Sequence, residues 1–212
     1  MKEKRKTLSE KKREDILKAA KRAFQAFGVQ GTSMDKLAEM ADVSKRTVYN
    51  HFATKEDIVL ELLRDLWNRS MIQADVEYQP DKPLKAQLGR LIEDEIDLVS
   101  GHEFLGLARA ATGYFLYRPE KLRHEIEKIG AAETAMHRWL QAAVDDNRLK
   151  PMDISVAVKQ LHNLVKGGCY WPQLLGYEPE LSSEAKKQLV DETAAMFLSH
   201  YQVRRARQSH PV

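Results

Sequence analysis

The sequence predicts an all-α protein of about nine helices, with a three-helix N-terminal head and a larger helical C-terminal domain. Apolar residues recur at a helical period through most of the chain. Capping residues and glycines mark the ends of these segments, and no segment shows sustained strict alternation typical of a strand. We expect a head over residues 1–53, with residues 1–9 as a flexible basic arm, a body over 54–205 and a tail over 206–212.

Three short helices make up the predicted head. The first, over residues 12–27, carries a stripe of apolar residues and stops at Gly28. The second begins at Thr32, which has Asp35 three residues later, the spacing of a capping box. After a turn, Ser44 caps the third helix.

The outer face of the third helix points to a function. Val48 and Phe52, four residues apart, turn inward, which leaves cations, hydroxyls and amides outside. Such a face is either solvated surface or a surface that meets phosphates and base edges. Charge favours the second interpretation, because residues 1–55 hold 14 Lys and Arg against 7 Asp and Glu, whereas residues 56–212 hold 20 against 24. We therefore predict a helix-turn-helix DNA-binding domain whose second helix enters a major groove.

The run from Ile16 to Leu60 resembles the DNA-binding head of the TetR (tetracycline-repressor-like) family of bacterial regulators. The residues that carry the resemblance are Ala19, Ala20, Phe24, Phe27, Gly28, Gly31, Thr32, Ser33, Leu37, Ala38, Ala41, Val43, Ser44, Thr47, Val48, Tyr49, His51, Phe52, Lys55 and Glu56. They cover about a fifth of the chain in fixed register.

The resemblance implies two kinds of DNA contact. Phosphate contacts are implied for Thr32 or Ser33, Tyr49, His51 and Lys55, and base-edge contacts for Lys45, Arg46, Thr47 and Asn50. Ser44, at the start of the second helix of the motif, is placed with them. Arg46 stands where the family often has a small residue, so it either contacts guanine or clamps the DNA backbone.

The body is predicted as six further helices, over residues 54–76, 84–100, 104–117, 119–147, 153–175 and 182–205. Apolar stripes on the last two are wider than one neighbouring helix needs. Two copies of the chain packing these helices into a four-helix bundle, as the family does, would make a homodimer that binds a pseudo-palindromic operator.

The family also implies a small-molecule inducer, apolar or amphipathic, held within the body. Aromatic and methionine side chains suit such a pocket. For any single residue core packing is the favoured interpretation, so the prediction concerns the group rather than its members. The candidate lining residues are Trp67, Met71, Phe104, Leu107, Ala111, Tyr114, Phe115, Met136, Trp139, His162 and Tyr170.

Other function classes lack support in the sequence. The histidines are scattered without paired ligand spacing, so no metal is expected, and no cofactor motif occurs. The carboxylates of residues 93–95 and 145–146 are interpreted as solvated surface, and Cys169 as a buried inert thiol. With a single cysteine, no signal sequence and no apolar span, we expect a cytoplasmic protein. Because the carboxylates have no partnered histidine or nucleophile, we do not expect an enzyme.

These patterns together predict a ligand-responsive transcriptional regulator, most simply a repressor released from a double-stranded DNA operator by its inducer. The alternative is an activator or an architectural DNA-binding protein without an inducer. An enzyme or interaction module that keeps the head as a scaffold is a further alternative.

Overall fold

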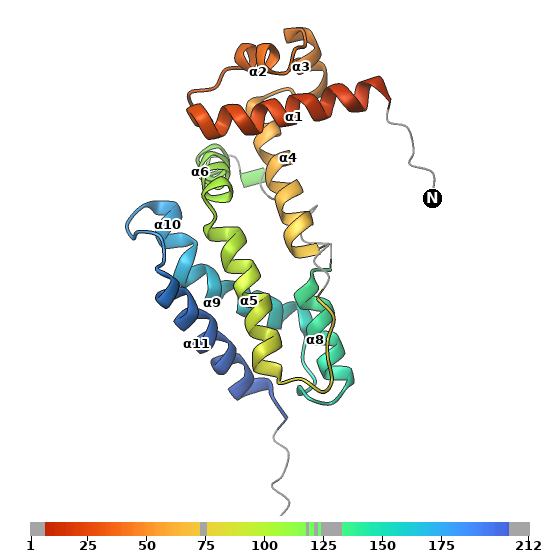
Figure 1. Ribbon diagram of the computed structural model, residues 1–212, viewed down its shortest axis with the longest axis vertical. Coiled ribbons are helices and arrows are strands. Elements are labelled where there is room, and N and C mark those ends of the chain that lie inside the picture. Colours follow the sequence, from red (N-terminus) through yellow and green to blue (C-terminus); the bar gives the residue numbers. More distant parts are fainter. Residues whose placement is uncertain (1–6, 73–75, 118, 121–122, 124–132, 204–212) are drawn as a thin grey trace, which may run out of the picture. The chain divides into compact units, whose positions relative to one another are not determined.

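A computed structural model describes residues 7–72, 76–117, 119–120, 123 and 133–203. This part of the chain holds ten α-helices and one π-helical turn (Figure 1). Its only β-type pairing is an isolated bridge between Leu149 and Gln202. The all-α prediction is confirmed. The chain forms two compact units, the first over residues 1–68 and 101–131 and the second over 69–100 and 132–212.

Helix α1 (Leu8–Phe27) is the longest element of the first unit. Thr7 accepts a hydrogen bond from the Glu10 backbone N–H, and the Glu10 carboxylate accepts one from the Thr7 N–H, a complete capping box. The helix therefore starts earlier than predicted, and residues 8 and 9 belong to it rather than to an arm. It stops at Gly28, whose φ of 69° is accessible at little cost without a side chain.

Helices α2 (Met34–Met40), α3 (Lys45–His51), α4 (Lys55–Trp67) and α6 (His102–Phe115) complete the first unit. The turn between α2 and α3 passes through Asp42 at φ 53°, a conformation that aspartate tolerates better than most residues. One apolar core joins these helices to α1. Its buried members include Ile16, Leu37, Val48, Ile58 and Leu107.

Helix α4 is shorter than the predicted helix over 54–76. Its start agrees with the prediction, since Thr54 and Asp57 form a capping box. It ends at Trp67, and a π-helical turn follows over Asn68–Ile72, within which the chain leaves the first unit. Residues 73–75 of the prediction lie outside the described residues.

The second unit contains α5 (Leu84–Ser100), α8 (Ala135–Asp145), α9 (Ile154–Cys169), α10 (Trp171–Leu175) and α11 (Ser183–Tyr201). Helix α9 packs against each of the other four. Two predicted helices prove to be interrupted. The segment 119–147 cannot be continuous, because Thr134 is extended and caps α8; residues 121–122 and 124–132 of that segment lie outside the described part. The segment 153–175 is interrupted at Tyr170, two residues before Pro172, which lacks a backbone donor.

Large apolar side chains fill the interior of the second unit, among them Ile92, Ile96, Trp139, Leu140 and Leu161. Polar contacts link α5 and α11 at the surface, where Lys186 Nζ lies 2.6 Å from Asp97 Oδ1. The units do not coincide with the predicted boundary at residue 54, because Ile58, Val59 and Leu62 of α4 share the core of α1–α3. A functional division into residues 1–53 and 54–205 stays a prediction.

Candidate nucleic-acid interface

Helix α3 is held by its cap and by two buried side chains. Ser44 Oγ accepts from the Thr47 N–H at 3.1 Å and lies 2.9 Å from Thr47 Oγ1. Val48 is fully buried and Phe52 nearly so, as their i, i+4 spacing predicts. Because both side chains lie on one side of the helix, the opposite side is fixed toward solvent.

That outer side brings together six of the residues predicted to contact DNA. Lys45, Arg46, Tyr49 and Asn50 are exposed, and Thr47 and His51 are half-buried. They occupy two turns of one helix, about the length that a recognition helix places in a major groove. Arg and Lys suit guanine O6 and N7, and Asn suits adenine.

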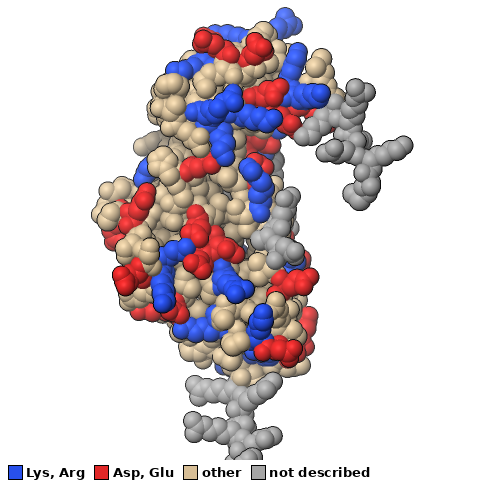
Figure 2. Space-filling view, in the orientation of Figure 1, with Lys and Arg blue, Asp and Glu red and all other residues tan. Residues whose placement is uncertain are grey.

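The ammonium group of Lys45 already has a partner in the free protein. Its Nζ lies 2.7 Å from Asp35 Oδ1 at the start of α2. The hydrogen bond with Asp35, and then the negative charge of Asp35, raise the pKa of Lys45. Both side chains are well exposed, and exposed ion pairs are weak, so the pair can open when a phosphate or base is offered. Lys and Arg lie beside Asp and Glu across the visible face of the first unit (Figure 2).

Thr32 and Ser33 have different roles from those implied by the predicted capping box. Thr32 is buried, and its hydroxyl donates to the Gly28 carbonyl oxygen at 2.8 Å. Ser33 caps α2 instead, accepting from the Lys36 N–H at 3.1 Å. The capping box at Thr32 and Asp35 is therefore wrong. Of the two hydroxyls, only that of Ser33 lies on an exposed residue.

Lys55, predicted to contact phosphate, is directed toward the backbone of its own unit. Its Nζ donates to the carbonyl oxygen of Val29 at 2.9 Å and to that of Thr32 at 3.4 Å. These bonds connect the first turn of α4 to the loop before α2. In this arrangement, the ammonium group ties α4 to the segment from which α2 begins.

The predicted ligand-binding residues divide between the two units. Trp67, Phe104, Leu107, Ala111, Tyr114 and Phe115 lie in the first unit, and Met71, Met136, Trp139, His162 and Tyr170 in the second. Leu107, Ala111 and Phe115 are core residues, packed with α1 and α4.

Each unit also contains a small hollow. In the first unit, a hollow of about 60 Å³ lies between α1 and α6 and includes Leu107. A hollow of about 10 Å³ in the second unit includes Met71 and Met136. Ligand pockets for small molecules usually measure about 300–1,000 Å³, so neither hollow accommodates an inducer as it stands.

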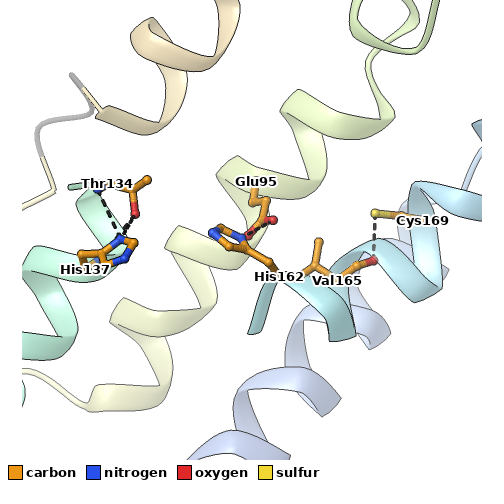
Figure 3. Close-up of polar contacts among 6 residues, drawn as sticks. All are labelled: Glu95, Thr134, His137, His162, Val165 and Cys169. Carbon is orange, nitrogen blue, oxygen red and sulfur yellow. Dashed lines mark hydrogen bonds and ion pairs between the residues drawn. The ribbon is translucent and has the colours of Figure 1, made fainter. Parts of the chain in front are cut away.

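Sequence reasoning missed a polar cluster inside the second unit. Glu95, predicted to be solvated, is fully buried on α5, and its Oε1 lies 2.5 Å from His162 Nδ1 on α9 (Figure 3). The prediction was wrong because Glu95 lies four residues after Leu91, on the apolar side of α5. The spacing of Glu95 from Leu91 along α5 could have indicated that Glu95 is buried. No local pattern could indicate its partner, because His162 is 67 residues away in the chain.

Cys169 and His137 lie in the same unit. Cys169 is buried, its Sγ donates to the Val165 carbonyl oxygen, and burial raises the pKa of its thiol to about 12. Burial, and then the charge of His162, lower the pKa of His137. Among the described residues, no three His, Cys, Asp or Glu side chains form a group that could hold a metal ion.

Two known protein-family models match this chain. Residues 16–62 match the model of the bacterial regulatory proteins of the tetR family, and residues 86–203 match that of the C-terminal domain of AefR-like transcriptional repressors. The chain belongs to the TetR family. Its helix-turn-helix is the DNA-binding part of a transcriptional regulator, and the family is one of regulators rather than enzymes.

Solved structures and curated proteins are similar to this chain. A TetR family regulator from Pseudomonas syringae is 36% identical, with a TM-score of 0.72 over 93% of this chain and 100% of that one. FadR from Bacillus subtilis is 18% identical, with a TM-score of 0.61 over 88% and 97% of the two chains, and shares the fold. The regulator TcmR of Streptomyces glaucescens is 26% identical over 57% of this chain and 59% of its own.

The chain spans about half the length of the curated relatives it matches. Within the described part of this TetR-family chain, no helix is long and apolar enough to cross a membrane.

Proposed function

We propose that this protein is a ligand-responsive transcriptional repressor that binds a pseudo-palindromic operator as a homodimer and leaves it when an inducer binds. The observation that carries the proposal is the outer side of α3, where four polar side chains are exposed beside a fully buried Val48. A transcriptional repressor must reach chromosomal DNA, so we place it in the bacterial cytoplasm.

The DNA contacts are proposed in two groups. Lys45, Arg46, Thr47 and Asn50 contact base edges, with Lys45 first releasing Asp35. Tyr49, His51 and Ser33 contact phosphates, which sets the register of the helix in the groove without selecting a sequence. Ser44 acts through the cap of α3, and Thr32 and Lys55 act by holding the loop before α2.

The dimer is proposed to form through α9 and α11, as predicted from their apolar stripes. Leu164 on α9 is 36% exposed and Met196 on α11 is 58% exposed, although both are large and apolar. Trp171, on the adjoining α10, is exposed as well. Apolar surface that is left uncovered on adjoining helices favours association with a second copy. Two recognition helices would then contact half-sites about 35 Å apart.

Ligand response is proposed by analogy with relatives of the same fold. The structure of FadR from Bacillus subtilis contains stearoyl-CoA, and the C-terminal part of this chain matches a domain named for a repressor. Binding of an inducer need change operator affinity only about 5- to 150-fold to act as a switch, which corresponds to a coupling of about 1–3 kcal/mol. The alternative is an activator or architectural protein without an inducer.

Selection of genomic fragments by the purified protein, at a stated salt concentration, tests the proposal. Enrichment of one inverted repeat is the expected result, and retention of DNA in proportion to its length would contradict it. Asn50→Ala should then relax the preference at particular bases, while Tyr49→Phe should weaken binding to all sequences alike. Unchanged base preference in Asn50→Ala would remove that residue from the base-contacting group. Release of the fragment by apolar compounds distinguishes a repressor with an inducer from the alternative.

A further inference from the structure

Glu95 is fully buried, and one of its two carboxylate oxygens has no hydrogen-bond partner among the described residues. His162 lies 2.5 Å from its Oε1, whereas Oε2 has no hydrogen-bond partner among the described residues. Buried polar atoms are nearly always paired, and an unpaired one in a native protein needs an explanation. A carboxylate oxygen held in this way is an acceptor for any donor that can reach it.

No described residue places a donor within hydrogen-bond distance of Oε2. Its neighbours on α5, Ile92 and Ile96, are buried and apolar. Cys169 is close enough for the charge of Glu95 to act on its thiol, but the Cys169 S–H donates to the Val165 carbonyl oxygen. Figure 3 shows the Cys169 thiol bonded to Val165 and the Glu95 carboxylate bonded to His162.

Two histidines extend the polar cluster from α5 to α8. The ring of His162 lies between Glu95 and His137 (Figure 3). His137 Nδ1 lies within hydrogen-bond distance of the Thr134 N–H and hydroxyl. Since the backbone N–H can only donate, Nδ1 of His137 accepts, and the ring proton is on Nε2. Helices α5, α8 and α9 thus place the buried Glu95 carboxylate and two partly buried imidazoles in one unit.

We propose that Glu95 receives the polar end of the inducer, and that this end is a hydrogen-bond donor, a hydroxyl or an ammonium group, on an apolar body. His162 is a positioning residue, because it holds Oε1 and leaves Oε2 directed at the ligand. The assignment rests on the proposed function, for which it names the ligand class. A molecule ending in a carboxylate is excluded, because it has no donor to offer Oε2 and would bring a second carboxylate against Glu95.

A matched series of probes tests the ligand class on the full-length wild-type protein. Hexyl, octyl and decyl compounds are compared as the alcohol, the alkylammonium, the methyl ether and the carboxylate, by calorimetry at pH 7.5. The methyl ether keeps the oxygen and removes only the donor. We expect an alcohol or ammonium to bind at least about tenfold more tightly than the ether of the same length, and the carboxylate to bind more weakly still.

Two variants test whether the preference for donors depends on Glu95. Glu95→Gln keeps the shape of the side chain but replaces the charged acceptor by an amide, so the preference for donors should fall and the carboxylate should gain affinity. Glu93→Gln is the control, since Glu93 lies on the same helix with an exposed side chain paired to Lys186, and its probe preferences should match the wild type. If Glu95→Gln does not fold, the probe series on the wild-type protein alone still tests whether the ligand ends in a donor.

Carboxylates binding as tightly as alcohols, or no alcohol or ammonium binding at any length, would overturn the assignment. So would a folded Glu95→Gln that keeps the wild-type preference, since Glu95 would then be structural only. Sequence-specific DNA binding by the ligand-free protein is measured separately. Its loss would refute the proposed function, whereas intact DNA binding with the wrong probe preference would refute only the ligand class.

Discussion

Lys55 on α4 donates from its Nζ to the carbonyl oxygen of Val29 at 2.9 Å, across 26 residues of sequence. The bond joins α4 to the loop that carries Thr32, the second residue whose carbonyl Lys55 contacts. A lysine expected to meet phosphate thus also bonds the backbone of the loop before α2, and its contact with phosphate stays a prediction.

Replacing Lys55 by methionine should therefore destabilise the protein. Hydrogen bonds from a charged donor contribute about 1.5–3 kcal/mol each, but the partial exposure of this group reduces the effect, so we expect a loss of about 1–2 kcal/mol in urea unfolding. Lys18→Met is the control, because Lys18 is well exposed and its nearest carboxylate is 3.9 Å away. Unchanged stability together with weaker DNA binding would return Lys55 to the phosphate-contacting group.

Asp35→Asn should strengthen binding to all DNA sequences severalfold. The change removes a negative charge that lies 2.7 Å from Lys45 at the start of α2, where it repels phosphates and occupies the ammonium group. Fluorescence anisotropy with specific and random duplexes at two salt concentrations measures the gain, which should shrink at high salt. A gain confined to the operator would instead mean that Asp35 acts through base contacts of Lys45.

Gly167 and Gly168 on α9 provide a matched pair. A Cβ at Gly168 would lie 2.8 Å from Leu189 Cδ1 on α11, whereas one at Gly167 would meet nothing within 4 Å. Gly167→Ala should stabilise the protein by up to about 1 kcal/mol. The Gly168→Ala variant should be less stable than the Gly167→Ala variant by about 1–3 kcal/mol. Thermal unfolding compares the two. Equal stabilities would mean that Leu189 moves aside at no cost.

Cys169 should resist thiol reagents in the folded protein. Burial, and then the charge of Glu95, raise the pKa of its thiol to about 12, so little of the reactive thiolate forms at pH 8. We expect a disulfide reagent to label native protein at least about 100-fold more slowly than protein in urea. Rapid labelling of the native state would show that α9 opens locally.

The stability of the second unit should depend on His137 below neutral pH. Burial lowers the pKa of His137 in the folded state, so the unfolded chain binds a proton more readily, and stability is lost as pH falls below about 6.5. His137→Gln keeps the residue type of a capping box and cannot titrate, so it should lose less stability than the wild type between pH 7.5 and 5.5.

Urea midpoints at the two pH values measure this difference. His102→Gln, on the exposed side of α6, serves as the control and should behave as the wild type. A wild-type pH dependence in His137→Gln would show that the effect does not come from His137.

The local sequence determined where several helices begin and which side of the recognition helix faces inward. Thr54 and Asp57, Ser44 and Asp153 cap helices where their spacing predicts, because a cap bonds only to residues within one turn. The inward direction of Val48 follows from the helical period alone. The same local rules identified the recognition helix and its outer residues.

Only the tertiary structure decided which polar groups meet. Lys45 pairs with Asp35, Lys55 reaches the loop before α2, and Glu95 is buried against His162. Each relationship depends on how one helix packs on another. A single sequence carries no local signal for that packing, because the bonded partners lie 10 to 67 residues apart and the energy that joins them comes from the shared core around them.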